Sequence, residues 1–237
     1  MADFAAYVFY VNRPDLLIRS LESFRHIWGN LTVLDNSPSG NAVDQISELG
    51  SDPSIGAMVG LVSSLNYVPP VPLAYAQGMN WMLKDALIKG VDFILHFHSD
   101  SYSKNPNAVQ ELLSYARKVR DGGKKWACLY TFYDILWCLN VDALRNMGGW
   151  DTNFPTYFGD NDFRRRAFLE GYECIDTGIQ GIGHEGSATI NSDGKLQFLN
   201  SRVFPLHEEL YREKHGGPPG KERFLHPYGQ EWLSWKP

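Results

Sequence analysis

The first half of the chain alternates short apolar runs with longer segments whose apolar residues recur at helical spacing. Runs rich in β-branched and aromatic residues predict strands over 7–11, 31–34 and 57–62, and over a nearly continuous apolar run that starts at Val91. The segments with helical spacing predict helices over 14–24, 43–49, 74–89 and 106–119. Repeated strand-then-helix order predicts an α/β fold with a mostly parallel central sheet and helices on both faces.

The second half is less regular. Its apolar pattern predicts strands over 126–131, 135–139 and 173–179, and helices over 142–147 and 160–170. A last helix is predicted from Phe204 on, and it gives way to the segment 214–220, Lys-His-Gly-Gly-Pro-Pro-Gly, and an aromatic tail. No internal repeat is present, so we expect one domain with a C-terminal tail.

Composition and charge exclude several classes of protein. The 237 residues are 43% hydrophobic and 14% aromatic, enough for one substantial core. The formal net charge of -5, from 22 basic and 27 acidic residues, gives no overall attraction to nucleic acid. Three cysteines without metal-ligand spacing argue against a disulfide framework. With no bilayer-spanning run or signal-peptide pattern, we expect a cytoplasmic protein with no membrane span and no nucleic-acid partner.

Two carboxylates stand at the ends of predicted strands. Asp35 follows the second strand, and Asp100 ends the apolar run of the fourth. Ligands of open α/β sheets bind outside the carboxyl ends of the strands, so both side chains fall where a ligand would lie. After the first strand comes Asn12-Arg13-Pro14, in which Pro14 suits the first helical position and Asn12 is a candidate cap.

Two glycines, an aromatic turn and two carboxylates follow one another in the segment 148–163. Asp160 and Asp162 open a helix, where acidic residues suit the positive end of the helix dipole. Taken alone, this Asp-x-Asp is an ordinary helix start. Asp162 and Arg166 are four residues apart, which predicts a side-chain pair on one helix face, and we assign no such partner to Asp160.

The ordered combination resembles the family 2 glycosyltransferases of the GT-A fold, which are inverting enzymes that use nucleotide sugars. The most specific similarity is Gly148-Gly149-Trp150-Asp151 followed by Asp160-Asn161-Asp162, Arg166 and Gly171. Weaker matches extend over most of the chain, at 11–14, 35–37, 77–80, 98–100 and His184. The resemblance implies a catalytic domain over 1–203, with a donor half 1–100 and an acceptor half 101–203, and a C-terminal helix and tail over 204–237.

The resemblance also implies roles for single residues at the donor. Asp35 would contact the nucleobase, although an Asx turn within its own loop is the alternative. Asp100 would hold a divalent cation against the donor diphosphate, and His184 would join it, with a loop cap as the alternative. The other implied donor contacts are Asn12, Arg13, Ser99 and, from a tail that closes over the phosphates, Lys214. A UDP-sugar is the favoured donor, and the acceptor is left open.

His98 departs from the family pattern, which has an acid at this position. Imidazole is a poor ligand for Mg²⁺ and an acceptable one for a transition metal, so His98 as a metal ligand favours Mn²⁺ over Mg²⁺. The alternative is a strand-end histidine that hydrogen-bonds a neighbour. His96, two residues earlier, is predicted to be a satisfied core histidine.

Asp160 is the candidate general base, because it matches the family's position and Asp162 already has Arg166 as a partner. A modest base suffices, since the attacking hydroxyl becomes more acidic as it bonds to an oxocarbenium-like carbon. Gly159 stands where the family usually has a second acid. Of the nearby aromatic residues, at least half are expected in the core and the rest against a sugar; they are Trp150, Phe154, Tyr157 and Phe158.

Two other functions compete with a glycosyltransferase. A nucleotidyltransferase on a related scaffold would need a glycine-rich phosphate loop with a lysine after the first strand, where this chain has Asn12-Arg13-Pro14. A catalytically silent carbohydrate- or nucleotide-binding module stays open because of His98. The three arginines 164–166 point in different directions on a helix, which favours a mixed surface over a phosphate or nucleic-acid site.

Overall fold

The computed structural model describes residues 3–37, 40–49, 53–64 and 73–235. Within them, a central sheet of seven strands has the order β3-β2-β1-β4-β7-β6-β8. Strand β7 is antiparallel to both neighbours, and the other adjacent pairs are parallel. The strands are β1 (Phe4–Tyr10), β2 (Leu31–Asp35), β3 (Val62–Ser64), β4 (Phe93–Phe97), β6 (Trp126–Tyr130), β7 (Leu136–Asn140) and β8 (Glu173–Asp176). The predicted α/β class with a mostly parallel sheet is confirmed.

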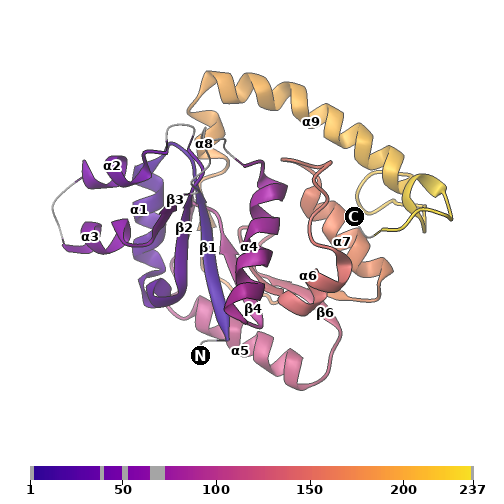
Figure 1. Ribbon diagram of the computed structural model, residues 1–237, viewed down its shortest axis with the longest axis horizontal. Helices are drawn as coiled ribbons and strands as arrows, with labels where there is room; N and C mark the ends of the chain where they lie inside the picture. The colour runs from indigo at the N-terminus through magenta and orange to yellow at the C-terminus, as the bar shows by residue number, and fades with distance from the viewer. Residues whose placement is uncertain (1–2, 38–39, 50–52, 65–72, 236–237) are drawn as a thin grey trace.

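Helices cover both faces of this sheet. They are α1 (Pro14–Ser23), α2 (Ala42–Ser47), α3 (Pro53–Val59), α4 (Tyr75–Lys89), α5 (Ala108–Asp121), α6 (Val141–Met147), α7 (Gly159–Leu169), α8 (Ala188–Asn191) and α9 (Gly194–His215), with short 3-10 helices η1 (Arg25–Asn30) and η2 (Pro227–Gly229). Alternate residues of β1 enter two cores: Ala6 and Val8 pack with α1 and α5, whereas Ala5 and Tyr7 pack with α4, α6 and α7. Figure 1 shows α4 in front of β1 and β4.

The third predicted strand is wrong in its position. The apolar run 57–62 is divided between α3, which ends at Val59, and β3, which begins at Val62. Met58 is buried, and Ile55 and Val59 pack against the same core. These three residues have the i, i+3, i+4 spacing of a helix, and a short apolar run does not by itself distinguish a helix from a strand.

The turn after β1 differs from the prediction in one residue. Helix α1 begins at Pro14, as predicted, but its N-cap is Arg13 and not Asn12. Asn12 has a φ of 54°, in the left-handed region that asparagine tolerates better than most residues. It therefore turns the chain before the helix instead of capping it.

A second sheet joins segments that are far apart in sequence. Strand β5 (Ser101–Ser103) pairs antiparallel with β9 (Ile182–His184), and Ser101 lies opposite His184. The apolar pattern predicted neither strand, because three residues are too few to show a period. This pairing brings His184 next to the end of β4.

The C-terminal helix is longer than predicted. Helix α9 begins at Gly194, not at Phe204, and the side chain of Asp193 accepts hydrogen bonds from the Lys195 and Leu196 backbone N–H groups. The expected boundary between residues 203 and 204 therefore lies inside α9. In Figure 1, α9 extends along one side of the molecule from α8 towards α7. Among the described helices, none is long and apolar enough to cross a membrane.

Candidate active site

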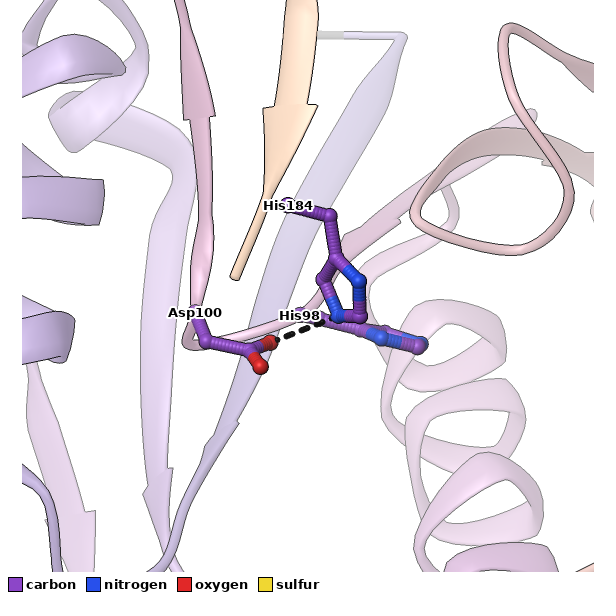
Figure 2. Close-up of side chains that lie close together, drawn as sticks. All are labelled: His98, Asp100 and His184. Carbon is purple, nitrogen blue, oxygen red and sulfur yellow. Dashed lines mark ion pairs between the residues drawn. The ribbon is translucent and has the colours of Figure 1, made fainter. Parts of the chain in front are cut away.

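Three side chains that were predicted to bind a metal meet at the carboxyl end of β4. His98 and Asp100 lie in the turn after β4, and His184 ends β9 (Figure 2). One ligand atom from each lies within 4.8 Å of the other two. The β5–β9 pairing places His184 here, so a long-range contact completes a cluster that the local sequence begins.

His184 and Asp100 form the closest contact in this cluster. Nε2 of His184 is 3.0 Å from Oδ1 of Asp100, and Nδ1 of His184 accepts a hydrogen bond from the Gly186 backbone N–H at 3.2 Å. Burial alone would raise the pKa of Asp100, but the neighbouring His184 and His98 outweigh it and lower that pKa. Asp100 is therefore an ionised carboxylate with imidazoles on two sides.

His98 contributes a buried nitrogen that has no hydrogen-bond partner. Its Nε2 lies 3.6 Å from Oδ2 of Asp134, too far for a hydrogen bond, and no described residue bonds to it. Burial alone would lower the pKa of His98, but the carboxylates of Asp134, Asp100 and Asp160 raise it. His98 therefore faces Asp134 at the distance of an ion pair, and both the metal-ligand assignment and the alternative of a contact with a neighbour stay predictions.

His96 is a core histidine, as predicted. It is 1% exposed, and its Nδ1 accepts a hydrogen bond from Trp137 Nε1 at 3.1 Å. Burial lowers its pKa to about 3, so the ring is neutral. It supports the strand and does not reach the candidate metal cluster.

The remaining donor-side predictions fall at the carboxyl ends of β1, β2 and β4. Asp35 is buried and accepts hydrogen bonds from Ser37 N and Ala42 N, both at 3.0 Å, which is the Asx-turn alternative. Its Oδ1 also accepts a hydrogen bond from Ser37 Oγ at 2.5 Å, and a base contact stays a prediction. Arg13 forms a two-bond pair with Asp15, at 2.7 and 2.8 Å. Ser99 lies in the turn after β4.

Helix α7 places its two carboxylates in different surroundings. Asp162 is fully buried, and its Oδ2 accepts from Arg166 Nε at 2.8 Å, which confirms the predicted pair. Asp160 accepts a bond from Asn161 Nδ2 at 3.2 Å, and burial and then the charge of Asp134 raise its pKa. Arg164, four residues on, also acts on Asp160 through its charge, which the sequence analysis overlooked.

Lys214 lies in ion pairs with two carboxylates, and its contact with the donor phosphates stays a prediction. Its Nζ is 2.6 Å from both Asp151 Oδ2 and Asp162 Oδ1, and the residue is 6% exposed. His215 Nε2 lies 2.9 Å from Asp162 Oδ1, and its ring stacks on Trp235. The buried carboxylates attract the ammonium group, so these contacts hold α9 against α7.

The structure adds two residues that the sequence analysis missed. Asp134 lies in the turn between β6 and β7, and the imidazole of His98 outweighs its burial and lowers its pKa to about 2. Tyr75 begins α4, and its hydroxyl is buried with no partner among the described residues. Aspartate is common in ordinary turns, so no local signal separates Asp134 from one.

The aromatic residues of 150–158 divide as expected between core and surface. Trp150 and Phe154 are 1% and 0% exposed. Tyr157 and Phe158 are half-buried, and both rings pack against Phe204 of α9. A sugar contact by these two rings stays a prediction, because α9 already covers part of their surface.

Comparison with known proteins identifies the fold. No family model matches the sequence, and no curated protein matches it. A mannosyltransferase from Pyrobaculum calidifontis, in complex with GDP-Man and Mn²⁺, matches with a TM-score of 0.52 and 12% identity over 73% of this chain and 54% of its own. Glucosyl-3-phosphoglycerate synthase from Mycobacterium tuberculosis, in complex with Mg²⁺ and UDP, matches with 0.54 and 12% over 85% and 79%.

A third solved structure widens the range of activities on this fold. A cytidylyltransferase from Leptospira borgpetersenii matches with a TM-score of 0.50 and 10% identity, over 76% of this chain and 78% of its own. This chain spans about half the length of the mannosyltransferase. The similarity establishes the GT-A fold, and at 10 to 12% identity it establishes nothing finer.

Proposed function

We propose that this protein is a glycosyltransferase that moves a sugar from a nucleoside-diphosphate sugar to an acceptor hydroxyl, with inversion. The observation that carries the proposal is a candidate cation cluster near a half-buried carboxylate: His98, Asp100 and His184 meet at the end of β4, and the charge of Asp160 acts on His98. The solved GT-A structures with GDP-Man and with UDP support a donor of the same kind. The assignment to family 2 rests on the sequence resemblance.

His98, Asp100 and His184 would hold a divalent cation. They fit one because one ligand atom of each lies within 4.8 Å of the other two, and His184 and Asp100 already face each other at 3.0 Å. Two imidazoles and one carboxylate favour Mn²⁺ over Mg²⁺. The chemistry that such a cation supplies when bound is neutralisation of the leaving diphosphate.

Asp160 would take the proton of the acceptor hydroxyl. Burial and the charge of Asp134 raise its pKa, and a raised pKa makes the carboxylate a stronger base. Asp160 stands on α7, whereas the cation cluster stands on β9 and the turn after β4. Inversion needs the attacking hydroxyl on the side of the sugar away from the diphosphate, and two separate elements suit that arrangement.

The donor contacts are proposed at the carboxyl ends of the parallel strands. Asn12 and Arg13 follow β1, Asp35 ends β2 and Ser99 follows β4. In an open parallel sheet these ends form one edge, where a nucleotide can reach all of them. A UDP-sugar is the favoured donor.

A thermal-shift panel of UDP, GDP, dTDP and CMP, each with and without Mn²⁺, tests the donor site. We expect the largest rise in melting temperature for UDP with Mn²⁺, the favoured nucleotide and cation. A ligand at 100 times its Kd stabilises the folded state by about 2.7 kcal/mol, so binding is measurable in this way. Asp100→Asn should remove the part of the shift that depends on Mn²⁺. If no nucleotide shifts the melting temperature, the donor-site assignment is wrong.

A nucleotidyltransferase is the second candidate, because a cytidylyltransferase shares the fold. It would release pyrophosphate from a nucleoside triphosphate and a sugar phosphate, whereas a glycosyltransferase releases a nucleoside diphosphate. The turn Asn12-Arg13-Pro14 has neither the glycines nor the lysine of a phosphate loop, which favours the glycosyltransferase. Hydrolysis of a donor sugar in the presence of Mn²⁺ would also separate an enzyme from a silent binding module.

A further inference from the structure

The three consecutive arginines of α7 have different partners. Arg166 Nε donates to Asp162 Oδ2 at 2.8 Å, and Arg165 Nη2 donates to the carbonyl of Phe224 at 3.0 Å. The guanidinium of Arg164 has no hydrogen-bond or ion-pair partner among the described residues, and its Nε and Nη2 are buried. Of the three, Arg164 is thus the arginine whose donors find no acceptor in the described part of the chain.

An aromatic ring supports Arg164 without satisfying its N–H groups. The guanidinium carbon lies over the Tyr130 ring, 4.5 Å from its centroid. Such a cation–π contact offers no lone pair to the N–H donors. Nη1 is not one of the buried nitrogens, and the residue is half-buried, so a ligand can reach the group from solvent. A guanidinium held in this way can bind a carboxylate or a phosphate through two donors.

Arg164 and the candidate base Asp160 lie on the same face of α7. They are four residues apart, which is about 6 Å along the helix axis. Burial and Asp134 raise the pKa of Asp160, and the charge of Arg164 opposes this rise, yet among the described ion pairs none joins the two residues. Both side chains are half-buried. They can therefore bind different parts of one molecule.

The position of Arg164 is separate from the candidate cation cluster. Trp137 of β7 lies opposite His96 of β4 on one side and opposite Tyr130 of β6 on the other. Adjacent strands are about 4.8 Å apart, so the backbone of Tyr130 is about 10 Å from β4, the strand that leads into the cluster. A diphosphate at the cluster and an anion at Arg164 would thus occupy different places.

We propose that Arg164 binds an anionic group of the acceptor, a phosphate or a carboxylate, a few bonds away from the hydroxyl that reacts at Asp160. This inference rests on the proposed function and names its acceptor class. The bound anion supplies the counter-charge that no described residue gives to Arg164, while the hydroxyl donates to the Asp160 carboxylate. The spacing of one helical turn between the two side chains limits the distance between the anion and the reacting hydroxyl.

Saturation-transfer difference NMR with three small probes tests this proposal. Glycerol 3-phosphate, glycerate and glycerol share a three-carbon chain with hydroxyl groups, and they carry a phosphate, a carboxylate or no charge. Spectra are recorded with and without saturating UDP and Mg²⁺, which separates binding at the donor site from binding at Arg164. We expect transfer to at least one anionic probe and none to glycerol. A signal from only one of the two anions would support the proposal and identify the group that Arg164 binds.

Arg164→Met removes the charge and keeps an unbranched side chain over Tyr130. The signal of the anionic probe should fall at least fivefold, while the thermal shift by UDP stays that of the wild type. Arg165→Met is the matched control, because it removes the same charge from the next residue of α7, and it should keep the full probe signal. Circular dichroism and the melting temperature show whether each variant is folded, and Arg164→Gln takes the place of the methionine variant if that variant does not fold.

Three results would overturn the proposal. The first is that neither anion binds, or that glycerol binds as well as the anions do. The second is that Arg164→Met binds the anionic probe as the wild type does. The third is that Arg165→Met loses as much signal as Arg164→Met, which would make the effect one of overall charge.

The thermal shift by nucleotide separates these results from failure of the proposed function. A normal nucleotide shift with an anion signal that does not depend on Arg164 would reject the anionic acceptor and leave the transferase. An anion signal that depends on Arg164, without any nucleotide shift, would retain the anion site and reject the transferase.

Discussion

Asp160 and Asp162 lie two residues apart in the first turn of α7, yet they belong to polar clusters of opposite character. Asp162 accepts from Arg166 at 2.8 Å and from Lys214 at 2.6 Å, and His215 Nε2 is 2.9 Å away. Near Asp160, the hydroxyl of Tyr75 is buried with no hydrogen-bond partner among the described residues, and Nε2 of His98 lies 3.6 Å from Asp134 Oδ2. Residues two apart on a helix point in nearly opposite directions, so one turn serves both clusters.

The difference in charged partners suggests different roles: a structural one for Asp162 and a functional one for Asp160. A buried carboxylate with three cationic or hydrogen-bonding partners is costly to break and fixes how α9 packs on α7. Asp160 has no comparable set of partners: Asn161 Nδ2 donates to it at 3.2 Å, and burial and the charge of Asp134 raise its pKa, as is common for carboxylates at functional sites. The same substitution at the two positions must therefore have different consequences.

Asp160→Asn should give the largest effect on activity. Loss of a general base typically lowers the rate by about 10² to 10⁴-fold. Because burial and Asp134 raise the pKa of Asp160, ionisation of this group opposes folding above its unfolded pKa, and the neutral amide should leave stability unchanged or raised. Initial rates of nucleoside-diphosphate release and a urea unfolding curve measure both quantities. Full activity in the folded variant would remove Asp160 from the mechanism.

Asp162→Asn should instead destabilise the fold. Breaking a buried ion pair costs about 3 to 5 kcal/mol, because the partner charges stay buried. Urea unfolding measures this loss. Asp142→Asn is the control: Asp142 pairs with Arg145 at 2.9 Å, but both side chains are more than half exposed, so about 0 to 1 kcal/mol is expected.

The pH dependence of the Asp162→Asn effect has a definite sign. Despite its burial, Asp162 has a pKa well below its usual range because of His215, Arg166 and Lys214. A carboxylate whose pKa is lowered by folding stabilises the fold at pH values above its unfolded pKa, which is about 3.9. This contribution to the free energy of unfolding is lost as the pH falls towards the folded pKa. The difference in unfolding free energy between wild type and variant should therefore narrow below about pH 4. A constant difference would mean that packing, not charge, accounts for the loss.

Much of the fold could be predicted from local patterns, and the exceptions have a common cause. The apolar runs of β1, β2 and β4 are long enough to show their type, and the four-residue spacing was sufficient to pair Asp162 with Arg166. Strands β5 and β9 have three residues each, too few to show a period. They form through their pairing with each other, which the local sequence does not reveal.

The candidate site was predictable only where its residues lie at strand ends or in the family motif. His98, Asp100 and His184 were found in this way, and the structure brings them together. Asp134 was missed because its environment comes from contacts with another strand end. The ion pairs of Lys214 were not predicted, because its partners, Asp151 and Asp162, are 63 and 52 residues away in sequence. A buried carboxylate that attracts a distant lysine leaves no local pattern.

His98→Asp should give the smallest effect, and it tests whether His98 is a metal ligand together with Asp100 and His184. Exchanging an imidazole nitrogen for a carboxylate oxygen favours Mg²⁺ relative to Mn²⁺, since Mg²⁺ prefers oxygen ligands. We expect the Mn²⁺ preference to fall about tenfold, which is about 1.4 kcal/mol. Calorimetric titration of each ion in the presence of UDP measures the ratio of the two Kd values.

The control for this exchange is His26→Asp, an exposed histidine in η1 that adds the same negative charge away from the cluster. It should leave the ratio unchanged. If His98→Asp also leaves the ratio of the two Kd values unchanged while both ions still bind, then His98 does not coordinate the cation. Its side chain would then serve only the ion pair with Asp134. In that case Asp100 and His184 alone would hold the ion, and the contrast with the Asp162 cluster would depend on the Tyr75 hydroxyl.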